Sequence, residues 1–151
     1  MNTDNNASTP NSSVEEINRA IEEQLMCVIY RSRSLIDEGG EQEILKVAQR
    51  NNPDLDVTGV LISNSGWFLQ VLEGPGMKVK KLLNKIEADT RHADFYVISK
   101  RAIDKRNFKE WSMASVSMDP LRFTQLVKDC INGGNQALDE VRNFLCFGKW
   151  T

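Results

Sequence analysis

Two polar side chains interrupt apolar runs that otherwise predict buried strands. Tyr30 closes the run of residues 25–30, and Gln70 lies in the middle of the run of residues 67–72. A phenol donates a hydrogen bond and can release a proton, whereas a side-chain amide both donates and accepts. A buried amide without partners costs about 1–3 kcal/mol. Gln70 therefore bonds a neighbouring side chain or water, lies on an exposed face, or has a functional role, and these alternatives stay open here.

Other reactive residue types form no recognisable site in the sequence. Asn52 follows a predicted helix and precedes Pro53, so by itself it indicates a helix terminus and a turn. His92 is the only histidine, and the three cysteines are widely spaced, which excludes a disulfide framework and the usual metal sites. No Gly-x-Ser-x-Gly turn accompanies His92, so hydrolysis is poorly supported. We expect a protein that is not an enzyme.

The composition is that of one soluble globular domain. The chain has 151 residues, of which 40% are hydrophobic and 26% are charged. Its 19 basic and 21 acidic residues give a net charge of −2, which argues against non-specific binding to nucleic acid. No apolar stretch approaches the roughly 18–20 residues of a membrane span, and residues 1–13 lack the features of a signal peptide. We therefore expect a cytoplasmic protein without membrane contact.

Hydrophobic periodicity predicts an α+β fold for the central part of the chain. The element order β-α-β-β-α-β-β is that of a ferredoxin-like sheet with both helices on one face. The predicted segments are a strand at 25–30, a helix at 41–51, strands at 57–62 and 67–72, a helix at 77–88, and strands at 95–99 and 112–117. Turn-forming residues join the second and third strands into a hairpin. The Glu-Gly-Pro-Gly sequence of residues 73–76 is predicted to end the third strand.

The two ends of the chain extend this domain. Residues 1–12 form a polar tail that we expect to be disordered, and residues 13–24 are predicted to form a short helix. Residues 118–151 contain two amphipathic helices, one starting at Asp119-Pro120 and the other at Asn135. Both faces of the third strand are apolar, so we expect the C-terminal helices to cover the face that the first two helices leave open.

The polar residues belong to an ordered set of motifs that spans roughly residues 25–117. The motifs are Val28-Ile29-Tyr30-Arg31-Ser32, Arg50-Asn51-Asn52-Pro53, Val57-Thr58-Gly59-Val60-Leu61, Phe68-Leu69-Gln70-Val71-Leu72-Glu73-Gly74-Pro75, Asp89-Thr90-Arg91-His92 and Arg106-Asn107-Phe108-Lys109-Glu110-Trp111-Ser112-Met113. Together they resemble a BLUF domain, a blue-light sensor that uses FAD. Each motif alone is weak, but their order is specific.

The resemblance implies that FAD binds non-covalently between the two helices of the sheet domain. It makes Tyr30 and Gln70 the photoactive pair: Tyr30 gives an electron and a proton to the flavin, and the hydrogen bonds of Gln70 then rearrange. Rotation and tautomerisation of the amide stay open. The cofactor-binding residues that it implies are Tyr30, Ile44, Asn51, Asn52, Gln70, Lys85, Asp89, Arg91 and His92. A solvated Lys85 and a charged turn at Arg91 and His92 are the alternatives for these basic residues.

The resemblance assigns signal transmission to Trp111 and Met113. These residues are two apart, so on one strand they share a side, and which of them is the inner residue stays open. Cys27 is expected to face away from Tyr30 as a small buried residue. About 34 residues follow Ser117, too few for an effector domain. The expected output is a protein–protein interaction, through homo-oligomers or a downstream protein partner.

Three other functions are weighed against this interpretation. An acylphosphatase-like hydrolase needs a glycine-rich loop after the first strand, and residues 31–34 contain no glycine. An RNA-recognition module exposes aromatic residues on its first and third strands, which Tyr30 and Phe68 imitate, but the acidic balance disfavours it. A flavin-free interaction domain with the same fold is disfavoured by the joint presence of Tyr30, Asn52 and Gln70.

Overall fold

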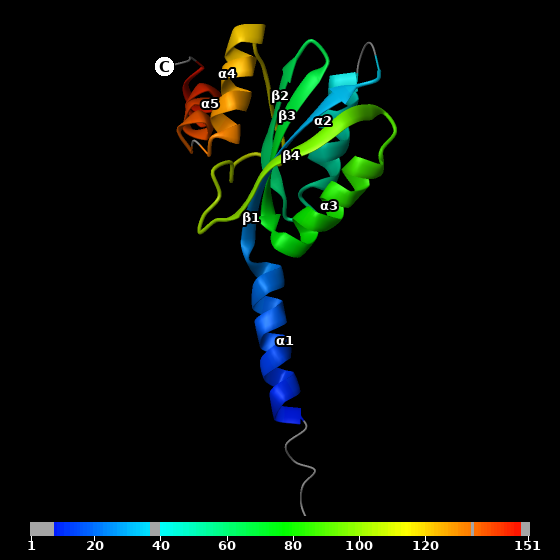
Figure 1. Ribbon diagram of the computed structural model, residues 1–151, viewed down its shortest axis with the longest axis vertical. Helices are drawn as coiled ribbons and strands as arrows, with labels where there is room; N and C mark the ends of the chain where they lie inside the picture. The colour runs from blue at the N-terminus through cyan, green and yellow to red at the C-terminus, as the bar shows by residue number, and fades with distance from the viewer. Residues whose placement is uncertain (1–7, 37–39, 134, 149–151) are drawn as a thin grey trace, which may run out of the picture.

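A five-stranded sheet in the order β4-β1-β3-β2-β5 forms the centre of the computed structural model, which describes residues 8–36, 40–133 and 135–148. Figure 1 shows helices on both faces of this sheet. The strands are β1 (Leu25–Ser34), β2 (Thr58–Asn64), β3 (Trp67–Pro75), β4 (His92–Ala102) and β5 (Ala114–Ser117). The helices are α1 (Ser8–Glu23), α2 (Gly40–Asn51), α3 (Gly76–Ala88), α4 (Pro120–Ile131) and α5 (Asn135–Phe147). The predicted α+β, ferredoxin-like class is confirmed.

The sheet is mixed, and only the β2–β3 pair is joined by a short connection. β1 pairs antiparallel with both β3 and β4, β3 pairs antiparallel with β2, and β2 pairs parallel with β5. The β2–β3 hairpin turns at Ser65 and Gly66, whose φ angles are 48° and 87°. Two consecutive positive φ values match the twist of antiparallel strands. The predicted hairpin is therefore present, with a tight two-residue connection.

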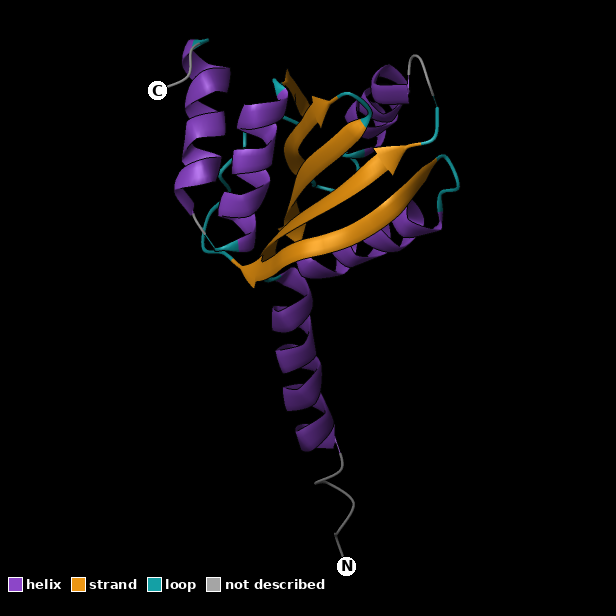
Figure 2. Cartoon of the chain, turned by 45° about the horizontal axis from the view of Figure 1, so that its top comes forward, coloured by secondary structure: helices purple, strands orange, loops and turns teal. Residues whose placement is uncertain are grey.

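Each face of the sheet has its own apolar core. Figure 2 shows α2 and α3 on one face and α4 and α5 on the other. The face under α2 and α3 buries Val28, Tyr30 and Phe68, while the face under α4 and α5 buries Cys27 and Ile29. The alternation of β1 between the two cores places Cys27 opposite Tyr30, as predicted. The C-terminal helices cover the second face, also as predicted.

Several boundaries differ from the sequence-based prediction because strand pairing overrides local turn propensity. β3 continues through Glu73-Gly74 to Pro75, since β1 pairs with it as far as Leu25 opposite Pro75. β1 and β4 are also longer than predicted. β5 is shorter, because residues 112 and 113 form a bend before Ala114. At the N-terminus, α1 begins at Ser8, inside the predicted tail, while residues 1–7 lie outside the described residues.

The fold argues against two of the alternative functions. An RNA-recognition module needs aromatic side chains on an open sheet face, but Tyr30 and Phe68 are both buried beneath α2 and α3. An acylphosphatase-like loop is absent as well, because residues 31–34 belong to β1. Across the helices that the structure describes, none combines the length and the apolar character of a membrane span.

The three cysteines differ in accessibility, which predicts their reactivity. Burial raises the pKa of the Cys27 thiol to about 12 and that of Cys130 to about 11, whereas Cys146 is exposed. Because the thiolate is the nucleophile, an aromatic disulfide reagent at pH 8 should modify one thiol quickly and the other two only after unfolding. Cys146→Ser should remove the fast phase. Two or more fast thiols in the wild-type protein would contradict this arrangement of the core.

Candidate functional site

A cavity of about 170 Å³ lies between α2, α3 and the sheet face formed by β1 and β3. All nine residues predicted to bind the cofactor line this one cavity, namely Tyr30, Ile44, Asn51, Asn52, Gln70, Lys85, Asp89, Arg91 and His92. They come from five different segments of the chain, and the fold brings them together. Their individual roles remain predictions, but their convergence makes this cavity the candidate site.

Tyr30 and Gln70 face each other across the β1–β3 pairing. They are direct partners in the strand register, and the Tyr30 Oη donates a hydrogen bond to Gln70 Oε1. Each side chain is 3% exposed. Burial raises the pKa of the Tyr30 phenol well above its usual range, so the phenol stays protonated and acts as the donor. Of the alternatives for Gln70, the structure shows a hydrogen bond to a neighbouring side chain. That side chain, Tyr30, also lines the cavity.

The other end of the Gln70 amide reaches the segment before β5. Its Nε2 lies 3.5 Å from the Met113 sulfur, and Met113 is 2% exposed. A thioether is a weak acceptor, so this contact is the weaker of the two bonds that Gln70 makes. The structure makes Met113 the inner residue. Gln70 thereby connects the phenol of β1 with the entry to β5.

The predicted shared side of Trp111 and Met113 is wrong. Met113 belongs to the core under α2 and α3, whereas Trp111 packs against the core under α4 and α5. The prediction assumed one regular strand, but the bend at residues 112 and 113 breaks the two-residue alternation. The two residues predicted to transmit the signal therefore contact opposite faces of the sheet.

Two side-chain amides at the C-terminal end of α2, one in its last turn and one directly after it, hold this same bend. The Asn52 Nδ2 donates to the Ser112 carbonyl oxygen at 2.8 Å, and the Gln49 Nε2 donates to the Met113 carbonyl oxygen at 3.1 Å. Asn52 is 1% exposed, and its own carbonyl oxygen accepts from the Val57 N–H at 2.9 Å. Asn52 thus ends α2, as its position before Pro53 predicts, and it also ties α2 to the segment before β5.

Charged residues gather where α2, the end of α3 and β4 meet at the cavity. Arg91 donates to both carboxylate oxygens of Asp89 and to Glu43 at 2.7 Å. The hydrogen bonds from Arg91 lower the pKa of Asp89 to about 2. His92 also lines the cavity, and its Nδ1 atom is buried with no hydrogen-bond partner among the described residues. An unpartnered buried nitrogen beside the cavity is what a polar ligand would satisfy.

Sequence reasoning missed Glu73, which fixes the loop from β4 to β5. Its carboxylate is fully buried and accepts from the backbone N–H of Asn107 and Phe108, at 2.9 and 2.7 Å, and from the Asn107 side chain. Arg106 of the same loop bonds Thr58 and the carbonyl oxygen of Asp56. The available signal was an acidic residue in a long apolar strand, but the Gly-Pro that follows made it look like part of a turn.

Comparisons with known proteins agree with this geometry. Residues 25–114 match the family described as "Sensors of blue-light using FAD". The blue light- and temperature-regulated antirepressor BluF of Escherichia coli (strain K12) is 35% identical over 100 residues, which are 65% of this chain and 24% of that protein. The beta subunit of a photoactivated adenylate cyclase from Euglena longa is 32% identical over 90 residues, or 59% of this chain and 10% of that protein.

A solved structure shows the same fold over most of the chain. The dark-state structure of the BLUF protein BlrB has a TM-score of 0.66 and 26% sequence identity, and the match covers 85% of this chain and 99% of that one. Because the family match covers more than half of the sequence, this chain belongs to the BLUF family. Its cofactor is FAD. The chain spans only a tenth to a quarter of the length of the two curated relatives.

The residues around the cavity fit a flavin. Apolar side chains from α2, α3 and the sheet, including Ile44, Leu82 and Phe68, line the cavity and can pack against a planar ring. Polar atoms that can both donate and accept lie at the edges, on Gln70 and His92. This division between apolar walls and a few polar groups is typical of cofactor sites. The geometry of this chain is thus compatible with the cofactor of its family.

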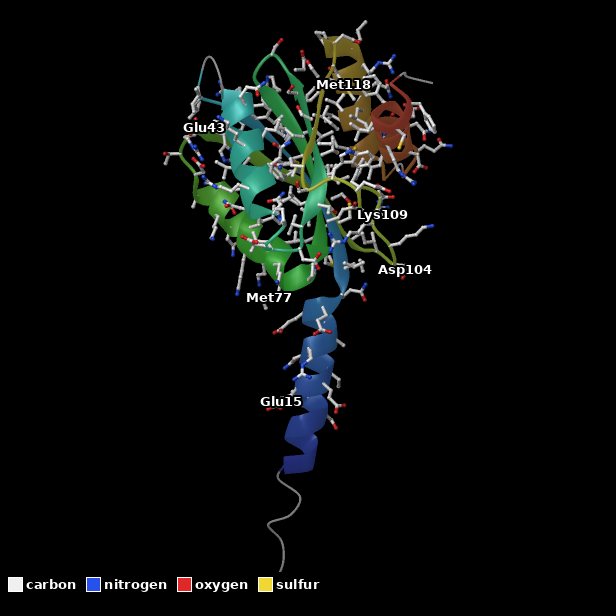
Figure 3. All side chains as sticks on the ribbon, turned by 180° about the vertical axis from the view of Figure 1, so that it is seen from behind. Glu15, Glu43, Met77, Asp104, Lys109 and Met118 are labelled. Atoms are coloured by element: carbon white, nitrogen blue, oxygen red, sulfur yellow. The ribbon has the colours of Figure 1, made fainter. Side chains whose placement is uncertain are left out.

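The buried carboxylate of Glu73 predicts a measurable loss of stability on substitution. Glu73→Gln should lower the free energy of unfolding by about 2 kcal/mol, because an amide N–H₂ would then face N–H donors of Asn107 or Phe108. The midpoint of urea denaturation should fall while its slope stays the same. Asp104→Asn is the matched control, since Asp104 is an exposed carboxylate of the same loop, labelled in Figure 3. Equal effects of the two substitutions would refute an anchoring role for Glu73.

Proposed function

We propose that this chain is a blue-light photoreceptor in which Tyr30 and Gln70 are the photoactive pair. The observation that supports this most directly is the buried hydrogen bond between the two side chains at the wall of the cavity. When bound, FAD supplies the absorption of blue light and an acceptor for an electron and a proton. The residues of the protein supply the donor, the hydrogen-bond switch and its connection to the rest of the fold.

Tyr30 is the donor of the electron and the proton in this proposal. Its phenol is buried and protonated in the dark, and its O–H bonds Gln70 Oε1. When the proton leaves, Tyr30 can no longer donate to Gln70. The amide can then present an N–H to the phenolic oxygen, because it carries both kinds of group. Rotation of the amide would bring its N–H to the phenolic oxygen, whereas tautomerisation would place an O–H there.

A rearranged Gln70 would also change its contact with Met113. The amide Nε2 that lies 3.5 Å from the Met113 sulfur is the group that must move or change its bonding. Met113 directly precedes β5, and Met118 and Asp119 connect β5 to α4. We therefore propose that light alters the packing of Trp111, Met113 and the helices from Pro120 onward. The output would be an altered contact with another protein, a copy of the chain or a downstream partner, rather than catalysis.

Substitution of the photoactive tyrosine tests this proposal. Tyr30→Phe should keep FAD bound, because only a hydroxyl is lost, and should abolish the small red shift of the flavin spectrum under blue light. Tyr96→Phe is the matched control, since Tyr96 is the second tyrosine of the sequence and is exposed on β4. Its spectrum should shift and recover like that of the wild type. A normal shift in Tyr30→Phe would remove Tyr30 from the proposed mechanism.

A second test addresses the role of Asn52 at the edge of the site. Asn52→Ala should weaken the retention of FAD or change its dark spectrum, and it should cost about 1 kcal/mol of stability through the lost bond to Ser112. Asn84→Ala removes an exposed amide of α3 that does not line the cavity and serves as the control. If Asn52→Ala lowers stability but leaves FAD binding, spectrum and photocycle intact, then Asn52 has a structural role alone.

A further inference from the structure

Among the helices that the structure describes, α1 alone stands away from the body of the protein. Figures 1 and 2 show it extending from the base of the sheet, away from the other helices. Every side chain from Ser13 to Glu23 is exposed. The helix is nevertheless tied to the body at its C-terminal end, where the Gln24 side chain donates to the Ile103 carbonyl oxygen at 3.1 Å. A free-standing helix of this length is marginal in water, so its surface calls for a partner.

One side of α1 carries an apolar stripe. Val14, Ile17 and Ile21 are spaced three and four residues apart, which places them on the same face. They are 54%, 59% and 65% exposed. Such a stripe is the pattern by which two helices pack against each other. Nothing in the described body covers it, and β-branched side chains at all three positions give it a stiff, flat surface.

The charges of α1 are arranged to leave this stripe free. The residues beside it are uncharged: Ser13, Asn18, Ala20 and Gln24. The charged residues lie on the remaining surface, and they are Glu15, Glu16, Arg19, Glu22 and Glu23. An identical stripe can therefore approach without bringing glutamates together. Four acidic residues against one basic residue give a charge of −3, which disfavours an anionic lipid surface as the partner.

A basic surface lies next to the end of α1. The Gly76 N–H donates to the Gln24 carbonyl oxygen at 2.9 Å, so α3 begins beside the point where α1 ends. Figure 3 labels Met77 at this junction and Glu15 farther out along α1. Met77 is exposed, as are three lysines in the first half of the same helix, Lys78, Lys80 and Lys81. The junction therefore offers an apolar side chain and positive charge to an acidic helix that lies along α1.

We propose that α1 is a docking surface for α1 of a second copy of this chain, packed in the antiparallel direction. Val14 would then meet Ile21 of the partner subunit, and the two Ile17 side chains would meet near the centre. The glutamates in the first half of α1 would lie toward the lysines of the partner's α3. A parallel arrangement would instead place both bodies at the same end and leave the glutamates without this basic neighbour.

The size of this contact limits its strength. A helix of 16 residues is about 24 Å long, so two of them bury less than the roughly 1,200 Å² of a standard stable interface. The resulting dimer should therefore have an affinity in the micromolar range. It should also weaken with salt, because attraction between glutamates and lysines is screened. Such a dimer forms and dissociates readily with protein concentration.

Sedimentation velocity of the full chain in the dark tests the docking surface without depending on photochemistry. Over about 5 to about 200 µM, the wild-type protein should shift from monomer to dimer. Ile17→Lys should stay monomeric with unchanged thermal stability, because the side chain is exposed. Glu23→Gln changes the charge by the same amount on the opposite side of α1 and should dimerise like the wild type. A monomeric wild type, or a dimer that Ile17→Lys leaves intact, would overturn the proposal.

Cross-linking tests the direction of packing. In a Cys146→Ser background, which removes the exposed thiol, Val14→Cys and Ile21→Cys are made as separate proteins. Under mild oxidation the mixture should form a disulfide-linked dimer between the two variants, while each variant alone should form little. Efficient cross-linking of Val14→Cys with itself would overturn the antiparallel arrangement. Reduced dimerisation at about 500 mM salt is expected, and an unchanged dimer would contradict the proposed contact with the lysines.

Discussion

The antiparallel pairing of β1 with β3 is the constraint on which the site depends. It sets Tyr30 opposite Gln70 and buries both, so that the phenol and the amide satisfy each other by a hydrogen bond. A register shift of one residue would turn one of the two side chains to the other face of the sheet and separate the pair. The long apolar runs of the two strands prevent such a shift, because each strand faces a separate core on each side. Ordinary packing thus holds a chemically unusual pair.

β3 serves both faces of the molecule within four residues. Gln70 points toward the cavity and reaches Met113, while Glu73 lies on the opposite face and fixes residues 107 and 108 of the loop from β4 to β5. The segment between these contacts ends in the bend at residues 112 and 113, which α2 holds through Asn52 and Gln49. The bend therefore connects the cavity, α2 and the far side of the sheet.

Periodicity predicted the elements well and their ends less well. The helix predicted at 77–88 is observed at Gly76–Ala88, and the hairpin of β2 and β3 lies where turn residues placed it. The errors arose where distant pairing overrides local preference, as at Glu73-Gly74, or where a bend interrupts alternation, as at Trp111 and Met113. The motifs predicted which residues converge on the cavity. Every residue has a backbone carbonyl, so nothing in the sequence marks those of Ser112 and Met113 as acceptors. Their hydrogen bonds to Asn52 and Gln49 could therefore not be predicted.

The short edge strand β5 allows a local movement that is separate from global unfolding. It has four residues and lies at the margin of the sheet, whereas β1 and β3 are central and pair over most of their length. Detaching a short edge strand is a local opening whose free energy is a small part of that of global unfolding. A movement that starts at Met113 therefore need not disturb the central strands. In the proposed mechanism the melting temperature and the ease of signalling depend on different strands, so mutation can adjust one while leaving the other unchanged.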